Sequence, residues 1–188
     1  MVTEFEKVML EQILQTTASK SLIYLQFFIG RVIKVESLSI NWLNNVAQQL
    51  KIGEEVVISR IELRERGELL GSIFLIFPFE IANQLAKDMY GELIPEISKK
   101  HVLDLVEEMT NIISAPPSET STFFPGQKPV LPSIARIVSY DDFKSLLVGQ
   151  ALVLELKMGG KMNGDIYFVL EEGIVKKLRR MLKMRERE

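Results

Sequence analysis

The sequence predicts an α+β fold: a single domain over residues 1–188, built from two pseudo-symmetric helix-strand-strand-strand-helix repeats. A central, mostly antiparallel sheet would carry the helices packed on it. Two observations support this prediction. The 188 residues are enough for one domain with a substantial core, and no linker rich in Pro, Gly or Ser separates the halves around residues 90–102. The same order of helix-like and strand-like segments also occurs in both halves.

The first repeat, about residues 4–92, begins with a helix predicted over residues 4–28, where apolar residues keep near-helical spacing. Residues 31–39 alternate in polarity and are rich in β-forming side chains, which predicts a strand. A short helix is expected over residues 41–50, ending near a glycine. The repeat is completed by strands over residues 55–65 and 69–77 and by a helix over residues 78–90, closed by Gly91.

The second repeat, about residues 100–185, follows the same plan. Residues 164–183 align with residues 71–91 at an offset of 93, so that a glycine, a β-type run and an amphipathic helix coincide. The leading helices align with Glu11 on Glu108, an offset of 97. The two offsets differ by four residues, which one loop of different length can account for, so an internal duplication is plausible.

The composition excludes several classes of function. A formal net charge of −2 gives no field that would attract nucleic acid. The absence of cysteine excludes disulfides and thiolate chemistry, and the single histidine, His101, excludes a His-rich metal centre, so no metal site is expected. No segment approaches the roughly 20 apolar residues of a membrane span, and the start lacks the pattern of a signal peptide. We therefore expect a cytoplasmic protein.

The most informative stretch is residues 101–115, which separates into two faces when drawn as a helix. Asp104, Glu108 and Asn111 share one polar face, where residues alone predict either a solvated surface or a partner surface. His101 falls near this face and is expected to be an ordinary residue of a helix N-terminus rather than an acid or base. The opposite face is apolar and predicts burial; it comprises Val102, Leu105, Val106, Met109, Ile112 and Ile113.

The spacing Asp104-x3-Glu108-x2-Asn111, followed by Pro132, resembles the motif of the CheC/CheX/FliY phosphatases. The strand and helix after Gly71 resemble the corresponding family segment, and the duplication matches a fold shared with the middle domain of the flagellar switch protein FliM. The resemblance covers roughly residues 4–183.

What this resemblance implies is an enzyme that docks on a phosphorylated CheY-type receiver domain and hydrolyses its aspartyl phosphate. Glu108 would dock on a receiver lysine, and Asn111 would orient the attacking water. Asp104 and Pro132 would belong to the partner-binding surface. No cofactor of its own is implied, because the receiver would hold the Mg²⁺. The deamidase CheD, flagellar switch proteins and a second copy of this chain remain open as partners.

Departures from the family motif keep an alternative open. In the first repeat Glu11 is present, but Leu14 stands at the Asn position, so that site is expected to be degenerate. Pro116 and Pro117 would kink or end the helix shortly after Asn111. The alternative is a catalytically degenerate CheC/FliM-like adaptor or flagellar-switch binding module.

Overall fold

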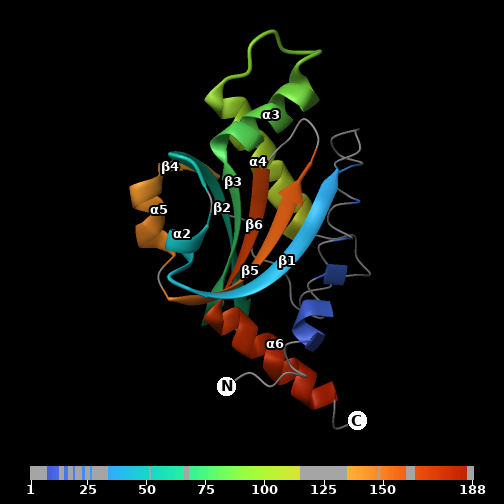
Figure 1. Ribbon diagram of the computed structural model, residues 1–188, viewed down its shortest axis with the longest axis vertical. Coiled ribbons are helices and arrows are strands. Elements are labelled where there is room, and N and C mark those ends of the chain that lie inside the picture. The colour runs from blue at the N-terminus through green and yellow to red at the C-terminus, as the bar shows by residue number, and fades with distance from the viewer. Residues whose placement is uncertain are drawn as a thin grey trace.

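The computed structural model describes most of the chain (Figure 1). The backbones of residues 111–114 and 181–185 are described without their side chains. The described residues are 8–12, 15–16, 19, 23, 26, 34–50, 52–65, 68–114, 135–147, 149–159 and 164–185.

The described strands form one six-stranded sheet in the order β1-β5-β6-β3-β2-β4, with every neighbouring pair antiparallel. The order is symmetric, because the first strand of each half pairs with the hairpin of the other half. This architecture confirms the predicted α+β fold class. The strands are β1 (Val35–Asn44), β2 (Glu55–Glu65), β3 (Glu68–Pro78), β4 (Arg136–Ser139), β5 (Gln150–Met158) and β6 (Gly164–Glu171).

Each central strand leads directly into a helix, β3 into α3 (Phe79–Tyr90) and β6 into α6 (Glu172–Arg185). The two helices start 93 residues apart, which is the offset found in the sequence. Two equivalent glycine–isoleucine contacts hold these helices against the sheet. Gly71 of β3, with φ +152°, faces the Ile174 side chain of α6, and Gly164 of β6, with φ +159°, faces the Ile81 side chain of α3. These glycines allow close approach and a backbone conformation that other residues rarely adopt.

Helices cover both faces of the sheet. On one face lie α3, α4 (Lys99–Ser114), α6 and the helical residues 8–12, whose Leu10 is buried against β2, β5 and α6. On the other face lie the short helices α2 (Val46–Gln49) and α5 (Tyr140–Leu146), seen together on the left in Figure 1. The core therefore has two apolar layers, one on each side of the sheet.

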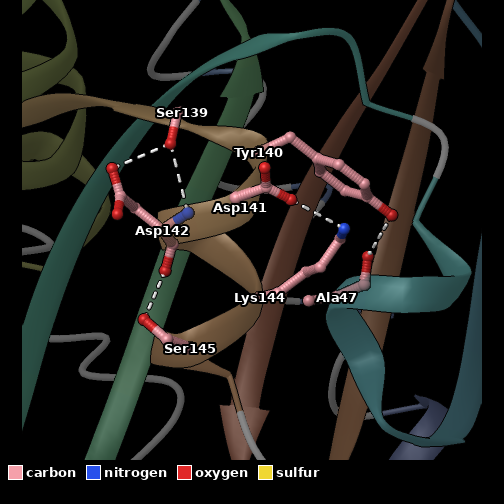
Figure 2. Close-up of polar contacts among 7 residues, drawn as sticks. All are labelled: Ala47, Ser139, Tyr140, Asp141, Asp142, Lys144 and Ser145. Atoms are coloured by element: carbon pink, nitrogen blue, oxygen red, sulfur yellow. Dashed lines mark hydrogen bonds and ion pairs between the residues drawn. The ribbon is translucent and has the colours of Figure 1, made fainter.

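Helix α5 is held at its start by a polar cap (Figure 2). The backbone N–H of Asp142 donates to the Ser139 side chain at 3.2 Å, the usual arrangement for a serine N-cap. The Tyr140 hydroxyl donates to the Ala47 carbonyl at 3.2 Å and so joins α5 to α2. The two short helices thus form one unit over the sheet.

The helix predicted over residues 41–50 is wrong in its first half. Strand β1 continues to Asn44, and only Val46–Gln49 is helical. The cause is long-range pairing: Asn41 and Trp42 lie opposite Val153 and Leu152 of β5. The strand predicted over residues 31–39 is observed from Val35 onward; residues 31–33 lie outside the described part. The described residues within the predicted helix 4–28 are helical.

Candidate functional site

Helix α4 begins with a cap that uses the only histidine of the chain. The backbone N–H of Ser98 donates to Nδ1 of His101 at 3.1 Å, and the Val102 N–H donates to the Ser98 carbonyl at 3.3 Å. A side chain three residues into a helix that accepts from the N-cap backbone is the arrangement of a capping box. His101 therefore helps to cap the N-terminus of α4, in line with the expectation of an ordinary N-terminal residue.

Four of the six residues predicted for the apolar face of α4 are buried, against α3 and β2. The side chains of the other two, Ile112 and Ile113, lie outside the described part of the chain. This burial fixes the rotation of the helix, because turning it would expose the apolar stripe to water. The polar stripe must then point outward. The buried residues are Val102, Leu105, Val106 and Met109, each at most 1% exposed.

Asp104 and Glu108 lie exposed one turn apart on the outward face of α4. Within the described part of the chain, neither carboxylate forms a hydrogen bond or an ion pair. Like charges four residues apart destabilise a helix slightly, by about 0.2–0.5 kcal/mol. The neighbouring Glu107 differs, because its Oε1 accepts the Ala135 N–H at 2.9 Å and links α4 to the start of β4. Glu107 serves the fold, whereas Asp104 and Glu108 are available to a partner.

Tyr90, at the end of α3, lies near this acidic face and is not among the residues that the sequence predicts for it. Its ring lies 6.2 Å from the His101 ring, centroid to centroid, at an angle of 56°. Its pKa is raised above the usual tyrosine value, first by burial and then by the negative charges of Asp104 and Glu108. The phenol therefore borders the acidic face, held there by the packing of α3 on α4. No periodic signal within residues 101–115 points to it.

Of the other predicted site residues, Asn111 lies in α4, seven residues after Asp104, and its side chain is outside the described part. Pro132 and Leu14 also lie outside the described residues, as do Pro116 and Pro117. Glu11 is helical and half-buried. The structure thus brings Asp104 and Glu108 together as the sequence predicts.

No group of three or more His, Cys, Asp or Glu side chains in the described part of the chain could hold a metal ion. Among the same residues, no helix is long and apolar enough to cross a membrane.

Comparisons with known proteins place these features in context. The family model "Chemotaxis phosphatase CheX" matches residues 57–122, a stretch that contains Tyr90, Asp104, Glu108 and Asn111. No curated protein sequence matches the chain.

Solved structures of this fold include FliY of Thermotoga maritima, which is 19% identical with a TM-score of 0.66 over 95% of this chain and 96% of that one. The FliM middle domain of H. pylori is 12% identical with a TM-score of 0.67 over 95% of this chain and 99% of that one. A chemotaxis protein CheX from Desulfovibrio desulfuricans is 18% identical with a TM-score of 0.51, over 85% and 99% of the two chains. These likenesses show the fold, and the family match supports a chemotaxis-related function.

Proposed function

We propose that this chain, whose match to the CheX model and whose fold support the CheC/CheX/FliY family predicted from its sequence, is a phosphatase of chemotaxis signalling. It docks on a phosphorylated CheY-type receiver and hydrolyses the aspartyl phosphate. The observation that carries the proposal is the exposed pair Asp104 and Glu108, which has no hydrogen bond or ion pair within the described part of the chain. The pair lies on the same helix as Asn111 and within the segment that matches the CheX model.

The residues suit phosphoryl chemistry, which needs placement and charge neutralisation more than covalent help. Glu108 offers a carboxylate to a receiver lysine. The carboxamide of Asn111 can accept a hydrogen bond from water and donate one to a phosphoryl oxygen. The water oxygen bonds to phosphorus while the bond to the aspartyl oxygen breaks. The receiver carboxylate leaves with the electron pair, and both water protons end on the released dihydrogen phosphate.

The metal for this step is expected in the partner. Receiver-bound Mg²⁺ would neutralise charge on the phosphoryl oxygens, so this chain contributes only side chains.

The test is the loss of phosphate from a phosphorylated CheY-type receiver with and without this protein. Wild type is expected to accelerate the loss. Asn111→Ala is expected to lower the rate at saturating receiver on the order of 100-fold while binding persists. Glu108→Lys is expected to weaken binding, because it presents a like charge to the receiver lysine. Glu107→Gln is the matched control, since it neutralises the adjacent carboxylate on the side that faces β4. A wild-type protein without acceleration contradicts the phosphatase proposal.

A second candidate function is a non-catalytic adaptor or flagellar-switch module. It is favoured by the likeness to FliM middle domains, one of which is described in a FliG–FliM complex from H. pylori and is 12% identical with a TM-score of 0.67. Leu14 at the Asn position of the first repeat also fits this candidate. Binding that depends on receiver phosphorylation, without any acceleration, would select the adaptor over the enzyme.

A further inference from the structure

The acidic face of α4 is too small to hold a protein partner by itself. A specific protein interface of standard size buries about 800 Å² on each partner, and much of its binding energy comes from a few anchors, among which tyrosine is enriched. Asp104, Glu108 and Asn111 supply polar groups only. A receiver that docks here needs apolar contact from neighbouring residues.

Such contact is present where α3 ends. Leu93, in the loop between α3 and α4, is 82% exposed, whereas the other exposed large apolar side chains of the described residues are 44–52% exposed. The backbone N–H groups of Leu93 and Ile94 both donate to the Tyr90 carbonyl at 2.8 Å. These bonds fold the backbone of the loop back onto the end of α3, so the backbone of Leu93 stays within one turn of Tyr90.

The two residues lie at one end of the polar stripe. His101, Asp104, Glu108 and Asn111 follow one another along the same side of α4, over roughly 15 Å at 1.5 Å per residue. The Tyr90 ring lies next to His101, at the start of this stripe, and Asn111 lies at its far end. In Figure 1 the loop after α3 forms the top of the molecule, above α4. A partner that reaches Asn111 along the stripe would also meet Tyr90 and Leu93.

We propose that Tyr90 and Leu93 form an apolar anchor for a phosphorylated receiver domain, next to the Glu108 contact. This inference rests on the proposed function. The occupant is chosen by charge complementarity: the exposed carboxylates of Asp104 and Glu108 match a surface that presents a lysine beside the phosphorylated aspartate. A second copy of this chain meeting the same face would set these carboxylates against one another. The anchor supplies affinity, whereas Asn111 acts on the reaction.

The experiment measures binding and catalysis separately in the full-length chain. Binding is titrated calorimetrically with a CheY-type receiver whose aspartate carries beryllium trifluoride and Mg²⁺, and hydrolysis is followed over a range of phosphorylated receiver concentrations. Leu93→Asp is expected to raise Kd and KM about tenfold and to leave kcat within about twofold. Because Leu93 is exposed, its variant should unfold at the same denaturant concentration as wild type. Tyr90→Phe keeps the ring and is expected to retain binding.

The matched control is Leu69→Asp, which places the same charge on an exposed leucine, 49% exposed, in β3. It should leave Kd and KM unchanged. Equal weakening by both leucine variants, or an unchanged Kd for Leu93→Asp, would overturn the anchor. If wild type hydrolyses the receiver phosphate and Asn111→Ala does not, the proposed function survives that outcome. A wild-type protein that neither binds nor hydrolyses overturns both proposals.

Discussion

Replacing Gly164 by alanine should destabilise the protein through one identifiable contact. Gly164 opens β6 with φ +159°, and a Cβ built there would overlap Cδ1 of Ile81 and lie 3.1 Å from its Cγ1. Ile81 is 6% exposed in α3, where a β-branched side chain has one strongly preferred rotamer. The added methyl therefore strains the backbone of β6 and pushes on the helix that ends in Tyr90.

The expected loss follows from these two effects. An unusual backbone conformation costs on the order of 1–3 kcal/mol for a residue with a Cβ, and overpacking of a filled core typically costs about 1–3 kcal/mol. Gly164→Ala should then lower the free energy of unfolding by about 2–6 kcal/mol. Gly71→Ala should cost less, because its Cβ would lie 3.1 Å from Cγ1 of Ile174 without overlapping any atom.

A double-mutant cycle isolates the contact. Ile81→Val removes Cδ1 and by itself costs about 0.5–1.5 kcal/mol. In the Ile81→Val background, Gly164→Ala should cost about 1 kcal/mol less than in wild type, because the overlapping atom is gone. Urea unfolding of the four proteins measures these free energies. Additive losses, or a Gly164→Ala loss below about 0.5 kcal/mol, would refute the reasoning.

Three further predictions concern the site and its supports. The pKa of the Tyr90 phenol is raised, so the folded state keeps the hydroxyl proton to a higher pH than the unfolded state does. The stability that the protonated phenol contributes is therefore lost as the pH rises through the raised pKa. Glu108→Gln should lower the pKa of Tyr90 toward the usual tyrosine value. This pKa is measured by titrating the phenolate absorbance and subtracting the titration of the Tyr90→Phe variant. Ser139→Ala removes the cap of α5 and should cost about 1 kcal/mol in urea unfolding; no loss would show that the cap is dispensable. Glu107→Ala leaves the N–H of Ala135 without its acceptor and should cost about 1–3 kcal/mol, whereas Glu107→Gln keeps an acceptor and should cost much less.

The fold was predictable where local pattern and tertiary structure agree. Strand β2 is observed at the residues predicted for it, and α3 ends at Tyr90 before Gly91, whose N–H donates to the Lys87 carbonyl. The pattern failed at residues 41–44. At these residues β1 is extended by pairing with β5, a strand more than 100 residues later in the chain. Local strand propensity does not predict such long-range pairing.

The site was predictable only in part, for a similar reason. The helical spacing of Asp104 and Glu108 placed both on the exposed face of α4, since the apolar residues between them have to be buried. Tyr90 belongs to another helix and the other repeat. Only the packing of α3 against α4 brings Tyr90 to the acidic face. A sequence motif within one repeat cannot predict a contact between residues of the two repeats.

The duplication separates what the fold requires from what the site requires. The paired glycines and isoleucines that seat α3 and α6 occur in both halves, with each glycine facing the isoleucine of the other half. The polar face does not repeat in this way. At the two sequence offsets, the positions of Tyr90, Asp104, Glu108 and Asn111 correspond to Lys183, Lys7, Glu11 and Leu14. Only the glutamate recurs, while two counterparts carry positive charge. The packing contacts are thus the same in both halves, whereas the polar residues that would meet a partner differ. This difference is expected if the face of the second repeat docks a receiver and the corresponding face of the first repeat does not.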